Sequence, residues 1–217
     1  MRDWLVQVDL HPLAIWLGDY TLSEAYVFRR RNRALEKTDG ASFRIWTVGH
    51  STRTITEFVE ILTSHHIKQL VDVRHYPGSR RLPHFNKAEL QAALERDGIH
   101  YEHLVELGGR RRPRTDSHNT AWRNESFRGY ADYMETQPFR QALEQLLELA
   151  HRAPTAIMCS EAVWWRCHRS MIADILKVEG VPVFHILSNT KEQEHPYTSA
   201  ARIVEGRLSY TGLLDQS

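Results

Sequence analysis

The stretch from Arg44 to Arg74, RIWTVGHSTRTITEFVEILTSHHIKQLVDVR, decides the fold. Its two ends, Arg44–His50 and Gln69–Arg74, are short, apolar and rich in β-branched residues, which is typical of buried parallel strands. Between them, Thr54–His66 carries apolar side chains at helical spacing. The order strand, helix, strand predicts two parallel strands joined by a crossover helix.

The same alternation continues along the chain. Further strands are predicted at Ile99–Leu104, Thr155–Ser160 and Val181–Leu187. Further helices are predicted at Lys87–Gly98, Phe127–Glu135, Pro138–His151 and Cys167–Gly180. We therefore expect a three-layer α/β fold with a mostly parallel, five-stranded sheet and helices on both faces.

The two ends of the chain follow a different pattern. Arg202–Gly212 predicts a short hairpin or an edge strand. Residues 1–42 do not join the alternation and are interpreted as an N-terminal extension, so residues 43–217 form the expected single α/β domain.

Composition excludes several classes of protein. The net charge of the 217 residues is +1, so no global charge favours nucleic acid or an anionic membrane. No apolar run approaches the roughly 20 residues that span a bilayer, and the N-terminus lacks the pattern of a signal peptide. Two cysteines are too few for a disulfide framework. We expect a cytoplasmic protein without a membrane partner.

Unusual polar residues follow the predicted strands where each one ends. His50 and Ser51 follow the first, Asp72 and Arg74 close the second, and His185 and Ser188 close the last. Ligands of open parallel sheets bind beyond the carboxyl ends of the strands. The pattern therefore predicts one cationic crevice at this edge of the sheet.

The candidate ligand-binding residues share a position on the loops that flank this edge. They are Ser51, Asp72, Arg74, Ser79, Arg80, Gly108, Gly109, Arg110, Cys167, His168 and Arg169. An arginine fork suits a phosphate or carboxylate, so the predicted ligand is an anionic small molecule or nucleotide, with nucleic acid as an alternative. Asp72 and Arg74 could instead form a buried ion pair that braces the sheet.

The segment MCSEAVWWRCHR, Met158–Arg169, holds both cysteines. Glu161 is the first candidate for acid–base catalysis, with His50 assisting and Cys159 as the reserve nucleophile. The spacing of Cys159 and Arg166 misses by one residue the C-x5-R loop of cysteine phosphatases. No cofactor is predicted. The alternatives for Cys159 and Cys167 are a zinc or iron site together with His168, a disulfide, or simple packing.

Several motifs together resemble a known family. They are TVGHSTRTITEFVEIL, LVDVRHYPGSRRLPHF, YEHLVELGGRRR, FRGYADYM and MCSEAVWWRCHR. In this order they resemble the domain-of-unknown-function family 488, an uncharacterised bacterial and archaeal α/β family, over about Phe43–Leu187. The family's GHS, DVR-x-x-P-x-S, LGG and C-x-E…CHR elements fall at His50–Ser51, Asp72–Ser79, Leu107–Gly109 and Cys159–Arg169. The resemblance implies a fold and a site, but no particular activity.

The sequence thus predicts an enzyme that hydrolyses or transfers a group on an anionic ligand. Two alternatives from other classes are a non-catalytic module that binds nucleotide or nucleic acid, and a metal or thiol redox protein that uses Cys159, Cys167 and His168.

Overall fold

The computed structural model describes residues 43–212; the predicted extension 1–42 and residues 213–217 lie outside the described residues. The strands of the main sheet are β1 Ile45–Gly49, β2 Gln69–Asp72, β3 His100–His103, β4 Thr155–Cys159, β5 Val183–Ser188 and β6 Lys191–Glu194. The α-helices are α2 Ile55–Ser64, α3 Lys87–Arg96, α4 Glu125–Met134, α5 Gln137–Arg152 and α6 Arg169–Val178. Single 3₁₀ turns lie at η1 Pro83–Phe85, η2 Val105–Leu107 and η3 Trp164–Arg166.

The sheet has the strand order β3-β2-β4-β1-β5-β6. β1 to β5 are mutually parallel, and β6 returns antiparallel to β5 at one edge. The predicted α/β class and parallel sheet are confirmed, but the predicted count of five strands is wrong because β6 makes a sixth. All four β6 residues, KEQE, are exposed, so this strand lacks the apolar alternation that identifies a strand in sequence.

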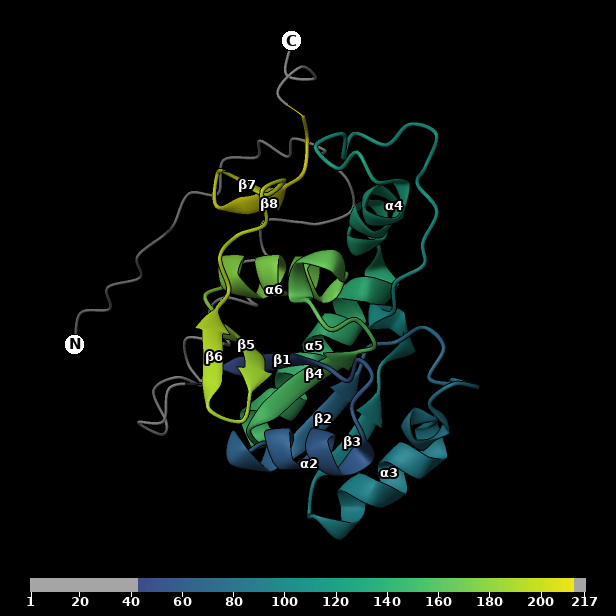
Figure 1. The fold of residues 1–217 in the computed structure, drawn as a ribbon. Coiled ribbons are helices and arrows are strands. Elements are labelled where there is room, and N and C mark those ends of the chain that lie inside the picture. The colour runs from purple at the N-terminus through teal and green to yellow at the C-terminus, as the bar shows by residue number, and fades with distance from the viewer. Residues whose placement is uncertain (1–42, 213–217) are drawn as a thin grey trace, which may run out of the picture. The chain divides into compact units, whose positions relative to one another are not determined.

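Helices cover both faces of the sheet, as predicted. α2 and α3 lie on one face, and α5 and α6 lie on the other (Figure 1). The core beneath α2 and α3 joins helix residues such as Phe58 and Leu90 to strand residues such as Leu70 and Met158. Successive strand residues point to opposite faces, and every residue of β2 and β4 is buried, so both faces of these two strands are covered, as the sequence indicated.

Local sequence sets the helix ends. Thr54 and Glu57 form a reciprocal capping box at the start of α2. Asn86 occupies the predicted N-cap position of α3, but its side-chain oxygen accepts a hydrogen bond from the Ser79 backbone N–H instead of from the helix. Gly180, with φ of +85°, ends α6 as predicted. Within residues 43–212 no helix has the length and apolar character needed to cross a membrane.

The predicted C-terminal hairpin is present as β7 Arg202–Val204 and β8 Arg207–Ser209, which pair with each other and not with the main sheet. Glu205 and Gly206 form the turn with positive φ at both positions, as a two-residue hairpin of this kind requires.

Candidate functional site

Parallel pairing brings three predicted site segments to one edge of the sheet. Gly49, the last residue of β1, pairs with Cys159, the last residue of β4, while Asp72 of β2 pairs with Met158. Pairing continues beyond the strand ends, because the His50 N–H donates to the Cys159 carbonyl and the Ser51 N–H to the Ser160 carbonyl, each at 3.0 Å. The chain after β1 is therefore fixed against the chain after β4.

Asp72 and Arg74 form a buried ion pair. Nη2 and Nε of Arg74 donate to the Asp72 carboxylate at 2.6 and 2.9 Å, and the two side chains are 6% and 0% exposed. The Tyr101 hydroxyl also donates to Asp72, at 2.8 Å. Nη1 of Arg74 points to Nε2 of His50, at 3.5 Å. The structure thus has the buried ion pair that the sequence analysis gave as an alternative. Ligand binding by Arg74 stays a prediction.

His50 is buried and stacks on Phe85, with ring centroids 4.1 Å apart. Burial, and then the positive charge of Arg74, lower the pKa of His50 to about 4, so the ring is neutral near pH 7. Its Nδ1 lies 2.9 Å from the Ser51 carbonyl, which can only accept. The proton is therefore on Nδ1, and the lone pair on Nε2 faces Arg74. Ser51 itself has φ of +53°, an unfavourable backbone conformation at this turn.

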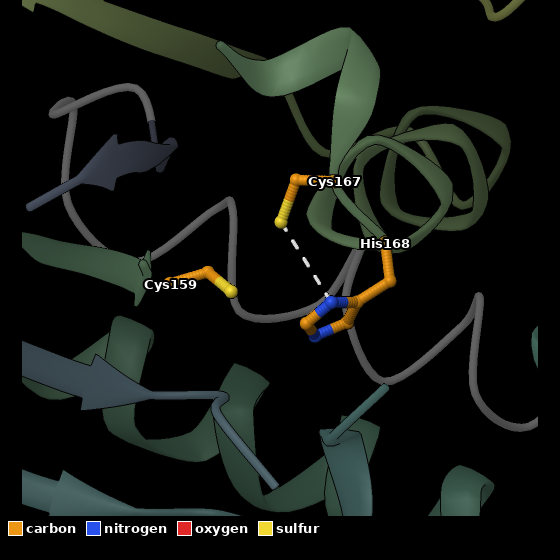
Figure 2. Close-up of side chains that lie close together, drawn as sticks. All are labelled: Cys159, Cys167 and His168. Atoms are coloured by element: carbon orange, nitrogen blue, oxygen red, sulfur yellow. Dashed lines mark hydrogen bonds between the residues drawn. The ribbon is translucent and has the colours of Figure 1, made fainter. Parts of the chain in front are cut away.

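The two thiols and one imidazole of the CHR segment meet at the end of β4. The ligand atoms of Cys159, Cys167 and His168 all lie within 4.8 Å of one another, and Figure 2 shows the two sulfur atoms and the ring turned toward each other. Nε2 of His168 donates to the Val73 carbonyl at 3.0 Å, which leaves Nδ1 with its lone pair facing the Cys167 sulfur at 3.7 Å. Among residues 43–212 this is the group of side chains that could hold a metal ion.

The two thiols have opposite tendencies to ionise. The pKa of Cys159 is held well below its usual value because the Cys167 thiol donates a hydrogen bond to its sulfur and because His168 and Arg169 lie nearby. Burial, and then the charge on Cys159, raise the pKa of Cys167. Of the two thiols, Cys159 is therefore the one that loses its proton more readily.

Arg169 is a buried cation at the start of α6, 2% exposed. Its Nη1 donates to the carbonyls of Glu161 and Val48 at 2.8 and 3.2 Å, and its Nη2 donates to that of Ala162 at 3.1 Å. Within residues 43–212 it makes no ion pair with a carboxylate. A buried charge needs compensation; the three carbonyl groups supply part of it, and the charge of Arg169 in turn lowers the pKa of Cys159.

Two glycines allow the loops of the GHS and LGG motifs to pack closely against the C-x-E…CHR segment. A Cβ on Gly49 would lie 1.9 Å from the Glu161 carbonyl oxygen and 2.9 Å from Nη1 of Arg169. A Cβ on Gly109 would lie 3.0 Å from Nδ1 of His168. The glycines of GHS and LGG thus let their loops approach the C-x-E…CHR segment closely.

The remaining predicted residues lie on the loops that follow β2 and η2. Gly108 packs against His75, and Ser79 accepts a hydrogen bond from the Leu82 backbone N–H. Arg80 and Arg110 are exposed, and the Arg110 guanidinium lies over the Tyr76 ring, 5.7 Å from its centroid.

The predicted crevice would expose its site residues to a ligand, but in the structure several of them are buried. Cys159 is 6% exposed and Arg74 is equally buried, whereas Ser160 and Glu161 are exposed. A ligand approaching this edge therefore meets the exposed loop after β4 before it meets a thiol.

Sequence reasoning misplaced His185 and missed its partners. His185 lies in the middle of β5, opposite Thr47, and not at the strand end. Its Nδ1 lies 2.7 Å from the Thr47 hydroxyl, its Nε2 lies 2.9 Å from Nδ1 of His195, and Nε2 of His195 lies 2.9 Å from Asp174. The Tyr210 hydroxyl also donates to Asp174, at 2.8 Å. All five side chains are buried.

This buried network ends on the Asp174 carboxylate. Burial, and then the neighbouring His195, lower the pKa of His185 to about 2, so the ring is neutral. A carboxylate only accepts, so Nε2 of His195 donates to Asp174. Trp164 stacks on His185 with ring centroids 4.3 Å apart, which links the network to the loop between the two cysteines.

The fold and site define the class: a parallel α/β protein with a buried dithiol–imidazole group at the carboxyl edge of its sheet. The model of the family described as domain of unknown function DUF488 matches residues 54–176, and the chain belongs to this family. Comparisons with curated proteins and with solved structures found no match.

Proposed function

We propose that this protein is an enzyme that transfers or hydrolyses a group of an anionic ligand, with Cys159 as its nucleophile. The observation that supports it is the orientation of His168: the Val73 carbonyl holds Nε2–H, so Nδ1 faces the thiols. Nucleophile, base and orienting group are the three parts of an activated thiol. Cys159 is therefore the first candidate for the catalytic residue, whereas the sequence analysis favoured Glu161 and kept Cys159 as the reserve nucleophile.

In the proposed reaction, the Cys159 sulfur attacks an electrophilic carbon or phosphorus of the ligand. The bond to the leaving group breaks with its electron pair, and His168, having taken the thiol proton, returns it to the leaving group. Water then attacks the covalent intermediate and gives a proton to His168, and the electron pair of the broken sulfur bond regenerates the thiolate. A different acceptor in place of water makes the reaction a transfer.

The exposed cations supply the proposed anion recognition. Arg80 and Arg110 follow β2 and η2, and within residues 43–212 neither forms an ion pair with a carboxylate. Glu161, two residues after Cys159, is exposed, so we assign it proton transfer to or from the ligand at the mouth of the site.

The first prediction concerns ligand binding and turnover. A thermal-shift screen of nucleotides, sugar phosphates and short oligonucleotides is expected to identify a stabilising anionic ligand. Arg110→Gln should weaken its binding about tenfold, because a charge-assisted hydrogen bond is lost. Cys159→Ser should retain binding and lower turnover by a factor on the order of 10³ or more.

Arg207→Gln is the matched control, since Arg207 is also exposed but lies on the β7–β8 hairpin. Binding without turnover by the unaltered protein, with the Cys159→Ser and Glu161→Gln variants binding equally well, would instead establish the non-catalytic binding module.

The second prediction is the pH dependence of alkylation. The groups facing Cys159 are Cys167, His168, Arg169, His50, Arg74 and Tyr130. A thiol reacts only after losing its proton, and the pKa of Cys159 is lowered. Its reaction with iodoacetamide should therefore reach its plateau below the ordinary thiol pKa of about 8.5, with Cys159 and not Cys167 modified first, as peptide mass spectrometry would report.

The paired variants Cys167→Ala and Cys167→Ser test whether the Cys167 thiol lowers the pKa of Cys159. Alanine removes the donor to the Cys159 sulfur and should move the alkylation profile to higher pH, while serine keeps a donor and should move it less. An unaltered profile with its midpoint near the ordinary thiol value would contradict the thiolate and the proposed nucleophile with it.

A further inference from the structure

The chain contains two cysteines, and the fold brings them together from the two ends of one loop. Cys159 closes β4, and Cys167 lies two residues before Arg169, the first residue of α6. Both are buried and free, and their sulfur atoms lie within 4.8 Å of each other. An intramolecular disulfide in this chain can therefore join only these two residues.

We propose that Cys159 and Cys167 form a reversible disulfide when the protein meets a peroxide, with Cys159 attacking the oxidant and Cys167 resolving the product. The disulfide itself needs only the two thiols. Its consequence, loss of the nucleophile and thus of activity, rests on the function proposed above.

The surroundings favour attack by Cys159. Arg169 is buried, has three carbonyl partners and within residues 43–212 no carboxylate, and its remaining Nε–H has no partner. This positive charge favours a thiolate at Cys159, which is the reactive form of cysteine. The lowered pKa of Cys159 and the raised pKa of Cys167 agree with this division, because a resolving thiol reacts second.

The chemistry balances with hydrogen peroxide as the oxidant. The Cys159 thiolate attacks one peroxide oxygen, the O–O bond breaks, and the products are a sulfenic acid and hydroxide. Cys167 then attacks the sulfenic sulfur, losing its proton to His168 or to the departing hydroxide, and water leaves as the S–S bond forms. Together two thiols and one peroxide give a disulfide and two waters, and an external dithiol reverses the change.

The loop between the cysteines must move for the new bond to form, because a disulfide brings the sulfur atoms to about 2.05 Å from each other. Ser160, Glu161 and Ala162 in this loop are exposed, but their carbonyl groups accept hydrogen bonds from the Ser51 backbone N–H and from Arg169. We therefore expect the shift to weaken these hydrogen bonds.

The test uses the full chain, reduced and then treated with one equivalent of hydrogen peroxide. Intact mass spectrometry should show the loss of two hydrogen atoms and of both alkylatable thiols, and reduction with dithiothreitol should restore both. Cys167→Ser should instead accumulate a sulfenic acid that dimedone traps, whereas Cys159→Ser should show neither product. The serine variants keep the size of the side chain, and their thermal unfolding is compared with the reduced protein to verify folding.

Several outcomes would overturn the inference. One is two free thiols after peroxide treatment of the folded protein. Another is stoichiometric zinc or iron in protein purified without chelator, with alkylation of the thiols only after the metal is removed, because both thiols would then be ligands. These results can be told apart from a failure of the proposed function. A disulfide without any ligand-dependent turnover would support the redox pair and contradict the proposed group transfer or hydrolysis. Turnover that depends on Cys159, without a disulfide, would support the proposed function and contradict the redox pair.

Discussion

Replacing Asp174 by alanine is expected to lower the free energy of unfolding by about 3–5 kcal/mol, the cost of breaking a buried, hydrogen-bonded charge network. Asp174 accepts hydrogen bonds from His195, Tyr210, and the side chain and backbone of Thr198. Alanine leaves the buried His195 and Tyr210 donors, and the half-buried Thr198 donors, without this acceptor. Urea unfolding followed by circular dichroism measures the change.

Two controls separate the network from a general effect of removing a carboxylate. Glu144→Ala, at an exposed position on α5, should change the unfolding free energy by less than about 0.5 kcal/mol. Tyr210→Phe removes one donor and should cost about 1 kcal/mol. If Asp174→Ala were no more costly than Tyr210→Phe, the network would not stabilise the fold beyond a single hydrogen bond.

The network also shows what sequence patterns can and cannot predict. Apolar periodicity predicted β1, β2 and β4 and their parallel pairing, because a buried strand must be apolar on both faces. The same reasoning placed His185 at the end of a strand, since a polar residue there is usually exposed to a ligand. Its actual partners come from β1 and from the segment after β6, and no local pattern contains such distant pairs.

The candidate site likewise has features that the sequence predicted and contacts that it did not. The position of Cys159, His50 and Asp72 at one edge follows from strand order, and sequence reasoning placed them there. Arg169 was expected at the ligand, yet its partners are backbone carbonyls of the loop that it supports. Backbone partners leave no trace in a sequence, because every residue has a carbonyl group. Tyr101 was missed as a partner of Asp72 for a similar reason: its own strand, β3, alternates between exposed and half-buried residues and looks weak.

Replacing Asp72 by alanine is expected to lower the free energy of unfolding by a similar amount, about 3–5 kcal/mol, because Arg74 would remain buried without its carboxylate. Tyr101 and the Arg74 backbone N–H would lose the same acceptor. Equilibrium unfolding in urea measures the loss, with Tyr101→Phe, expected to cost about 1 kcal/mol, as the graded comparison.

The double variant Asp72→Ala, Arg74→Met decides between the two roles that the sequence left open for Arg74. If the pair is a brace, removing the buried charge as well as its partner should recover much of the lost stability, since an apolar side chain costs less here than an unpaired guanidinium. If Arg74 instead serves a ligand, Asp72→Ala would leave the free protein nearly as stable and would strengthen anion binding, because the carboxylate that competes for the guanidinium is gone. The side-chain hydrogen-bond partners of the Arg74 guanidinium are the Asp72 carboxylate and the neutral ring of His50, and both are buried. That geometry makes loss of stability the expected result.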